Sequence, residues 1–256
     1  MTGIGAIRGV LFDVHDTLII KDYRASTQGL LNSVGVLQAA GYEITADEYQ
    51  AAWKKASRMA RQDVEELGEV TLEGWYGAIL NGMGITDYSP RLVEDINSAF
   101  NEAFTTATKA LPQTKSTLRR LKRSHLLGIV SNSLAPNTIS DLKVSGIHDL
   151  FDAIVISSDF GKRKPHPAIF MNALERLSIS PAEAVFVGDN LYEDIFGAKE
   201  LGMRAVLLTH PLVERERSLR SHMPMQSGEV CGQPDACITG LSELTGVLDG
   251  WNVRRR

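Results

Sequence analysis

The chain has 256 residues, 43% of them hydrophobic, so it is long enough to bury a sizeable core as one large domain or two small ones. Its formal net charge of -4 gives no basic excess for a nucleic-acid backbone, and no apolar run reaches the roughly 18 residues of a membrane span. We therefore expect no nucleic-acid partner, no membrane partner and a cytoplasmic location.

The first predicted element is a strand at residues 9–12, where the apolar run GVLF leads directly into Asp13. The residues that follow lack strand signals of comparable strength and place apolar side chains three and four residues apart, as amphipathic helices do. Four helices are predicted there, at residues 24–40, 46–67, 71–81 and 90–107. We therefore predict an α-helical domain over residues 21–108, inserted into a core domain of residues 1–20 and 109–256.

Beyond the insertion, short apolar runs alternate with helical patterns. The predicted strands are residues 126–130, 153–156, 184–187 and 205–208, and the predicted helices are residues 137–144, 167–177 and 194–201. The apolar runs contain no alternating polar residues, which is typical of strands buried on both faces of a parallel sheet. The sequence thus predicts an α/β fold with a Rossmann-like, doubly wound parallel sheet. Residues 211–234 favour only a loop or a short helix, and a short strand and a closing helix follow.

Polar and charged side chains follow four of the predicted strands. They are Asp13, His15, Asp16 and Thr17 after the first strand, Ser131, Asn132 and Ser133 after the second, Lys164 after the third, and Asp189, Asn190 and Asp194 after the fourth. The carboxyl ends of parallel strands meet at one edge of the sheet, where ligands bind. Asp13 and Asp189 would repel each other there unless a cation lay between them, and carboxylate oxygens suit Mg2+. With Lys164 and the Ser131 hydroxyl as phosphate donors, this pattern predicts metal-assisted phosphoryl transfer through an aspartyl-phosphate.

Four segments resemble the four motifs of the haloacid dehalogenase superfamily, in the same order and over almost the whole chain. They read LFDVHDTL, IVSNS, GKRKPHPAIF and FVGDNLYEDIFGAKELGM. The insertion of roughly 90 residues lies between the first two motifs, which is the arrangement of members with a type 1 helical cap.

The resemblance implies a role for each matching residue. Asp13 would be the nucleophile and a metal ligand, and Ser131 and Lys164 would hold the transferring phosphoryl group, with Thr17 and Asn132 completing the phosphate site. Asp189 and the backbone carbonyl of His15 would bind Mg2+, and Asp194 would support the metal directly or through its waters. The implied substrate is a small phosphorylated metabolite.

His15 departs from the pattern, because most phosphatases of the superfamily carry a second aspartate there as general acid and base, followed by glycine where this chain has Asp16. In one interpretation the imidazole replaces that carboxylate. In a second, the leaving group needs no protonation, as in relatives that cleave phosphonates or haloacids. In a third, the chain is a catalytically weak binding protein.

Two further observations bear on these alternatives. Asp194 five residues after Asp189 resembles a metal-using phosphatase rather than the metal-free dehalogenases. A phosphonate reaction would also want a cap lysine, for which Lys54 and Lys55 are candidates by location, although a solvated helix face explains them more simply. The leading expectation is therefore a Mg2+-dependent phosphatase with His15 in the general acid and base position.

Overall fold

The computed structural model describes residues 6–62, 69–219 and 232–253. The chain divides into two compact units. One consists of Met1–Ile20 and Lys109–Arg256, and the other of Lys21–Thr108. The first unit is therefore discontinuous in sequence, and the second is inserted after its first strand.

The first unit is built on a six-stranded parallel sheet with the strand order β5-β4-β1-β6-β7-β8. Its strands are β1 (Gly9–Phe12), β4 (Leu126–Ser131), β5 (Ala153–Ile156), β6 (Ala184–Gly188), β7 (Arg204–Leu208) and β8 (Ala236–Ile238). The predicted α/β fold with a parallel sheet is confirmed. β1 lies in the interior of the sheet, with Phe12 opposite Ile129 of β4 and Val187 of β6. The strand that leads into Asp13 is thus flanked by the strands that lead into two other motifs.

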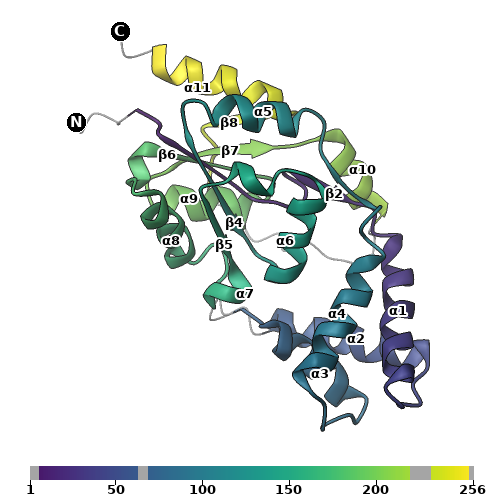
Figure 1. Cartoon of the computed structure of the whole chain (residues 1–256). Helices are drawn as coiled ribbons and strands as arrows, with labels where there is room; N and C mark the ends of the chain where they lie inside the picture. The colour runs from purple at the N-terminus through teal and green to yellow at the C-terminus, as the bar shows by residue number, and fades with distance from the viewer. Residues whose placement is uncertain (1–5, 63–68, 220–231, 254–256) are drawn as a thin grey trace. The chain divides into compact units, whose positions relative to one another are not determined.

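Both faces of the sheet are buried, as the unbroken apolar runs predict. Val10 and Phe12 of β1 pack in a cluster with side chains of α5, α6, α10 and α11, whereas Leu11 packs in a cluster with side chains of α8 and α9. These helices are labelled on the ribbon in Figure 1. The helices of this unit are α5 (Thr114–Leu121), α6 (Ala135–Val144), α7 (Ser157–Phe160), α8 (Pro167–Leu177), α9 (Gly197–Glu200), α10 (Pro211–Leu219) and α11 (Leu244–Val253). Three short 3-10 helices lie at His148–Leu150, Pro181–Glu183 and Leu241–Glu243.

One predicted helix of this unit has a different form. Residues 194–201 are predicted as a single helix, but the structure has a π-helix over Leu191–Phe196 followed by α9. The side chain of Asn190 accepts hydrogen bonds from the N–H groups of Tyr192 and Glu193, so the helical turn begins three residues earlier than the apolar pattern indicates.

The second unit contains four helices, α1 (Ala25–Ala39), α2 (Ala46–Gln62), α3 (Leu72–Gly82) and α4 (Pro90–Glu102). Buried apolar side chains from all four helices form its core, including Leu37, Tyr49, Ile79 and Ile96. The inserted helical region is therefore confirmed. The predicted last helix ends at Glu102 instead of residue 107, and the last part of the predicted helix 46–67 lies outside the described residues.

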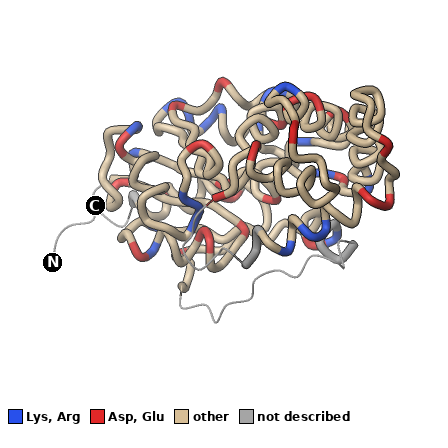
Figure 2. Tube along the Cα trace, turned by 90° about the horizontal axis from the view of Figure 1, so that it is seen from below, with Lys and Arg blue, Asp and Glu red and all other residues tan. Residues whose placement is uncertain are grey.

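Two three-residue strands, β2 (Ile19–Lys21) and β3 (Thr108–Ala110), pair where the chain passes between the units, and the sequence patterns do not predict them. No helix among the described residues has the length and the apolar character needed to cross a bilayer. Basic and acidic residues are interspersed along the trace rather than separated by sign (Figure 2). Of the predicted loop or short helix at residues 211–234, α10 accounts for the first nine residues, and 220–231 lie outside the described part.

Candidate active site

The candidate site lies at the carboxyl ends of β1, β4 and β6. Asp13 follows the last residue of β1, β4 ends on Ser131, and β6 ends on Gly188, which precedes Asp189. The strand order changes direction here, because the chain runs from β1 to β4 on one side and later returns to β6 on the other. Such a switch point is where open α/β sheets bind their ligands.

The turn after β1 is fixed to the neighbouring strand end. The N–H of Asp13 donates to the carbonyl of Val187 at 3.0 Å, and the Thr17 hydroxyl donates to Oδ1 of Asp189 at 2.9 Å. Asp16 has a φ of 64°, in the left-handed region that aspartate enters more readily than most side chains. This conformation gives a physical reason for the glycine that the resemblance implies at this position.

Lys164 is buried between two carboxylates. Its Nζ donates to Oδ1 of Asp13 at 2.7 Å and to Oδ1 of Asp194 at 2.6 Å, and its side chain is 1% exposed. Burial acts to lower the pKa of Lys164, but the charges of Asp13, Asp194 and Glu193 outweigh burial and raise it. The ammonium therefore stays charged at neutral pH.

Asn132 holds the main chain of Lys164. Its Oδ1 accepts from the N–H of Lys164 at 2.7 Å, and its Nδ2 donates to the carbonyl of Lys164 at 3.0 Å. The amide side chain thus fixes the lysine loop against the end of β4. A contribution of Asn132 to phosphate binding stays a prediction.

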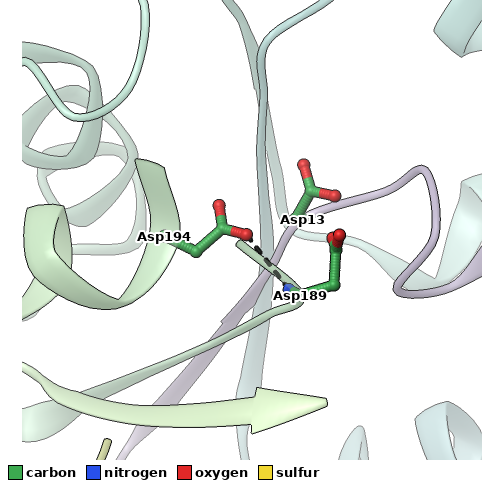
Figure 3. Close-up of side chains that lie close together, drawn as sticks. All are labelled: Asp13, Asp189 and Asp194. Atoms are coloured by element: carbon green, nitrogen blue, oxygen red, sulfur yellow. Dashed lines mark hydrogen bonds between the residues drawn. The ribbon is translucent and has the colours of Figure 1, made fainter. Parts of the chain in front are cut away.

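Asp194 reaches back from the π-helix to the end of β6. Its Oδ2 accepts from the N–H of Asp189 at 3.1 Å (Figure 3) and from the N–H of Asn190 at 3.0 Å. A Cβ at Gly188 would lie 2.3 Å from this Oδ2, so only glycine permits the approach. Burial raises the pKa of Asp194, and the charge of Lys164 opposes the shift.

Ser131 belongs to a chain of hydroxyl groups. The Ser133 hydroxyl donates to Oγ of Ser131 at 3.2 Å and lies 2.6 Å from Oγ1 of Thr138 on α6. Ser131 is 1% exposed and is the last residue of β4, which pairs with β1. Its hydroxyl is therefore held in place at the edge of the sheet where Asp13 lies.

His15 is held by a residue that the sequence patterns do not single out. Its Nε2 lies 2.8 Å from Oδ2 of Asp141, which belongs to α6. The side chain of His15 is 25% exposed and that of Asp141 is 7% exposed. The histidine is thus only partly buried, whereas its partner is almost completely enclosed.

The carboxylates fit a divalent cation. In the described part of the chain, oxygen atoms of Asp13, Asp189 and Asp194 lie within 4.8 Å of one another, and the three side chains converge from β1, β6 and the π-helix (Figure 3). Oxygen ligands on opposite sides of one magnesium ion are about 4.2 Å apart, so small rotations suffice for shared binding. The single ammonium of Lys164 leaves the cluster with excess negative charge. The donor set and the charge both suit Mg2+ or a similar hard cation.

The structure brings together the predicted site residues at the edge of one sheet. They are Asp13, His15, Thr17, Ser131, Asn132, Lys164, Asp189 and Asp194. Sequence reasoning missed Thr138 and Asp141. Both lie on the buried face of α6, and no motif distinguishes them from other polar residues of a predicted helix. Their one-turn spacing is the only sequence signal that relates them.

The chain is similar to known hydrolases over most of its length. Residues 10–208 match the family described as haloacid dehalogenase-like hydrolase. A glyceraldehyde 3-phosphate phosphatase of Methanopyrus kandleri is 33% identical over 201 residues, which cover 78% of this chain and 83% of that protein. A phosphoglycolate phosphatase of Yersinia pestis is 26% identical over 87% of this chain and 89% of its own length.

Among solved structures, a 2-haloacid dehalogenase from Pseudomonas syringae pv. Tomato superposes with a TM-score of 0.67. It is 25% identical, and the match covers 96% of this chain and 99% of that protein. The fold is thus shared with a dehalogenase, while the curated sequence relatives named above are phosphatases.

Proposed function

The chain belongs to the haloacid dehalogenase-like hydrolase family and is a phosphatase within it; on this premise we propose that it hydrolyses a small phosphorylated metabolite through an aspartyl-phosphate on Asp13, with Mg2+ as cofactor. The observation that carries the proposal is the buried ion pair between Lys164 and Asp13, beside the carboxylates of Asp189 and Asp194. It supports a site in which a nucleophilic carboxylate lies next to a fixed cation that can receive phosphate oxygens.

In the first step, a carboxylate oxygen of Asp13 attacks phosphorus, and the bond from phosphorus to the ester oxygen breaks. Lys164 and the Ser131 hydroxyl hold oxygens of the transferring group, and His15 gives a proton to the leaving oxygen. In the second step, water attacks the phosphorus of the aspartyl-phosphate, His15 takes the proton, and Asp13 is released. Mg2+, held by Asp13, Asp189 and the backbone carbonyl of His15, would neutralise charge between the two anions.

Asp194 has a supporting role in this proposal. Its Oδ1 accepts from Lys164 and its Oδ2 accepts from two N–H groups, so both oxygens already have donors. We infer that it fixes Asp189 and Lys164 and contacts the metal mainly through water.

For the substrate we propose a phosphate ester of a small hydroxylated aldehyde or acid. Two similar proteins support this choice, a glyceraldehyde 3-phosphate phosphatase and a phosphoglycolate phosphatase. The phosphonate alternative finds less support, because Lys54 and Lys55 both lie exposed on α2. The haloacid alternative finds less support because Asp189 adds a carboxylate that a metal-free reaction does not need.

A substrate panel tests the proposal. Phosphate release is measured from glyceraldehyde 3-phosphate, phosphoglycolate and p-nitrophenyl phosphate, with MgCl2 or with EDTA. The wild type should release phosphate only with the metal, and Asp13→Asn should lower kcat by about 10⁴-fold or more. Asp149→Asn, at a side chain that is 99% exposed, is the matched control and should behave as wild type. Equal rates in the wild type and Asp13→Asn would instead support the binding-protein alternative.

A further inference from the structure

The contact between His15 and Asp141 joins two distant parts of the first unit. The two residues are 126 positions apart, and Nε2 lies 2.8 Å from Oδ2. Aspartate is almost never fully buried unless it is paired. Asp141 is buried, with 5% of the whole residue exposed and 7% of its side chain. Because the carboxylate of Asp141 is buried, it does not serve solubility, and its position needs another explanation.

Asp141 lies on a helix that is anchored to the sheet. Leu142 and Ala135 of α6 are buried, and Leu142 packs in the cluster that contains Phe12. Thr138, one turn before Asp141, is completely buried and lies 2.6 Å from the Ser133 hydroxyl. One face of α6 therefore contacts both the loop after β1 and the loop after β4, and its two polar side chains are held by packing.

We propose that Asp141 is a positioning residue for His15, an inference that rests on the proposed function of His15 as general acid and base. The carboxylate accepts a hydrogen bond from Nε2–H, which fixes the orientation and the tautomer of the ring. Nδ1 is then the atom that exchanges protons with the substrate. A carboxylate behind an imidazole takes the place of the single aspartate usual at this position.

The proton follows one path in this arrangement. While Asp13 forms its bond to phosphorus and the ester bond breaks, the proton on Nδ1 moves to the departing oxygen. The ring is then neutral and keeps Nε2–H on Asp141. When water attacks the aspartyl-phosphate, one proton of that water moves to Nδ1, and the carboxylate of Asp13 and inorganic phosphate are released. The imidazole thus returns to its starting state after each turnover.

The test compares two phosphate esters, one whose leaving group must be protonated as it departs and one whose leaving group departs without a proton. Glycerol 3-phosphate has a poor leaving group, whereas 2,4-dinitrophenolate leaves without protonation. In Asp141→Asn, kcat for glycerol 3-phosphate should fall by about 10-fold or more, as loss of general acid catalysis predicts, with KM little changed. The pre-steady-state release of dinitrophenolate should keep its wild-type rate. Asp149→Asn changes an exposed His–Asp pair with the same 2.8 Å separation and should leave both substrates unaffected.

Two further measurements separate positioning from a merely structural role. In a His15→Gln background, Asp141→Asn should cause no additional loss, because the residue acts through His15. Nitrogen NMR of histidine should show a proton on Nε2 of His15 in the wild type, whether or not Nδ1 is also protonated, and a changed Nε2 signal in Asp141→Asn. Cooperative thermal unfolding checks that each variant is folded.

Three results would overturn the proposal. The first is that Asp141→Asn lowers the rate equally for both substrates, and the second is that it lowers kcat further in the His15→Gln background. The third is that kcat for glycerol 3-phosphate is unchanged in Asp141→Asn while turnover still depends on Asp13. In that last case the proposed function stands and only the role of Asp141 fails. If turnover does not depend on Asp13, both proposals fail together.

Discussion

Lys164 and Asp13 form a buried ion pair in which Nζ lies 2.7 Å from Oδ1, although 151 residues separate them in the chain. The same ammonium is 2.6 Å from Asp194. Each of these carboxylates would otherwise be a buried charge facing another of the same sign. The lysine therefore stabilises the site and, in the proposed function, presents a cation where phosphate oxygens arrive.

Lys164→Met should destabilise the protein, because it leaves Asp13 and Asp194 without their shared partner. Breaking a buried ion pair costs about 3–5 kcal/mol, which urea unfolding at pH 7 measures as a fall in the free energy of unfolding. Lys199→Met is the control, since the Lys199 pair with Asp235 is about one-third exposed and should contribute less than about 1 kcal/mol. Similar small losses in both variants would show that the buried pair contributes little.

Gly188→Ala should disturb the site locally. The added Cβ would lie 2.3 Å from Oδ2 of Asp194, so the carboxylate must move and release its two N–H donors. We expect a loss of about 1–3 kcal/mol in the free energy of unfolding, together with reduced phosphatase activity. Gly246→Ala on α11 meets no atom within 4 Å and should be neutral or slightly stabilising. Unchanged activity and stability in Gly188→Ala would contradict the close packing described above.

Tyr49 should make the protein sensitive to alkaline pH. Burial raises the pKa of Tyr49 to about 12, whereas an unfolded tyrosine titrates near 10. Below pH 10 the ring is neutral in both states and the shift has no effect. Between pH 10 and 12 the unfolded state loses the proton first, so stability should fall by about 1.4 kcal/mol per pH unit from this group.

Urea unfolding of the wild type and Tyr49→Phe between pH 8 and 11 isolates this contribution. The variant should lose less stability than the wild type above pH 10, and the two curves should run parallel below that pH. Tyr42→Phe, at a ring that is only partly buried, is the control. Parallel curves over the whole range would mean that Tyr49 ionises as easily in the folded state as in the unfolded state.

His15→Asp should strengthen magnesium binding. The substitution adds a carboxylate two residues after Asp13, and added negative charge near the metal ligands favours a bound divalent cation. A titration of activity against MgCl2 should show half-saturation at lower metal concentration in the variant than in the wild type. His148→Asp, at a partly exposed surface position, should not change the metal requirement. An equal or weaker requirement in the wild type would refute the expectation.

The sequence predicts the sheet of this fold well for a simple reason. β1, β4, β5, β6 and β7 are buried on both faces, so each is an unbroken apolar run, and each predicted run lies on the observed strand to within a residue at either end. β2 and β3 are only three residues long and carry no such pattern. The π-helix is not predicted either. Over a single turn, the spacing of apolar side chains does not distinguish a π-helix from the first turn of an α-helix.

Strand ends account for only part of the predicted site, because Lys164 lies eight residues after β5 with α7 between them. Asp13, Ser131 and Asp189 lie at strand ends, so topology alone brings them to one edge. Asp141 lies in the middle of α6, and its contact with His15 depends on how that helix packs on the sheet. Helix packing angles and side-chain directions are not encoded in a local pattern, so a single sequence does not reveal this pair.

The central claim is that Asp13 carries the phosphoryl group during turnover. A rapid-quench reaction with p-nitrophenyl phosphate and MgCl2, followed by mass spectrometry of the digested protein, measures this directly. We predict a burst of nitrophenolate in the wild type, with acid-stable phosphate on the peptide that contains Asp13, and no label on that peptide in Asp13→Asn. Full turnover without a phosphorylated Asp13 peptide, or undiminished turnover in Asp13→Asn, would contradict the account.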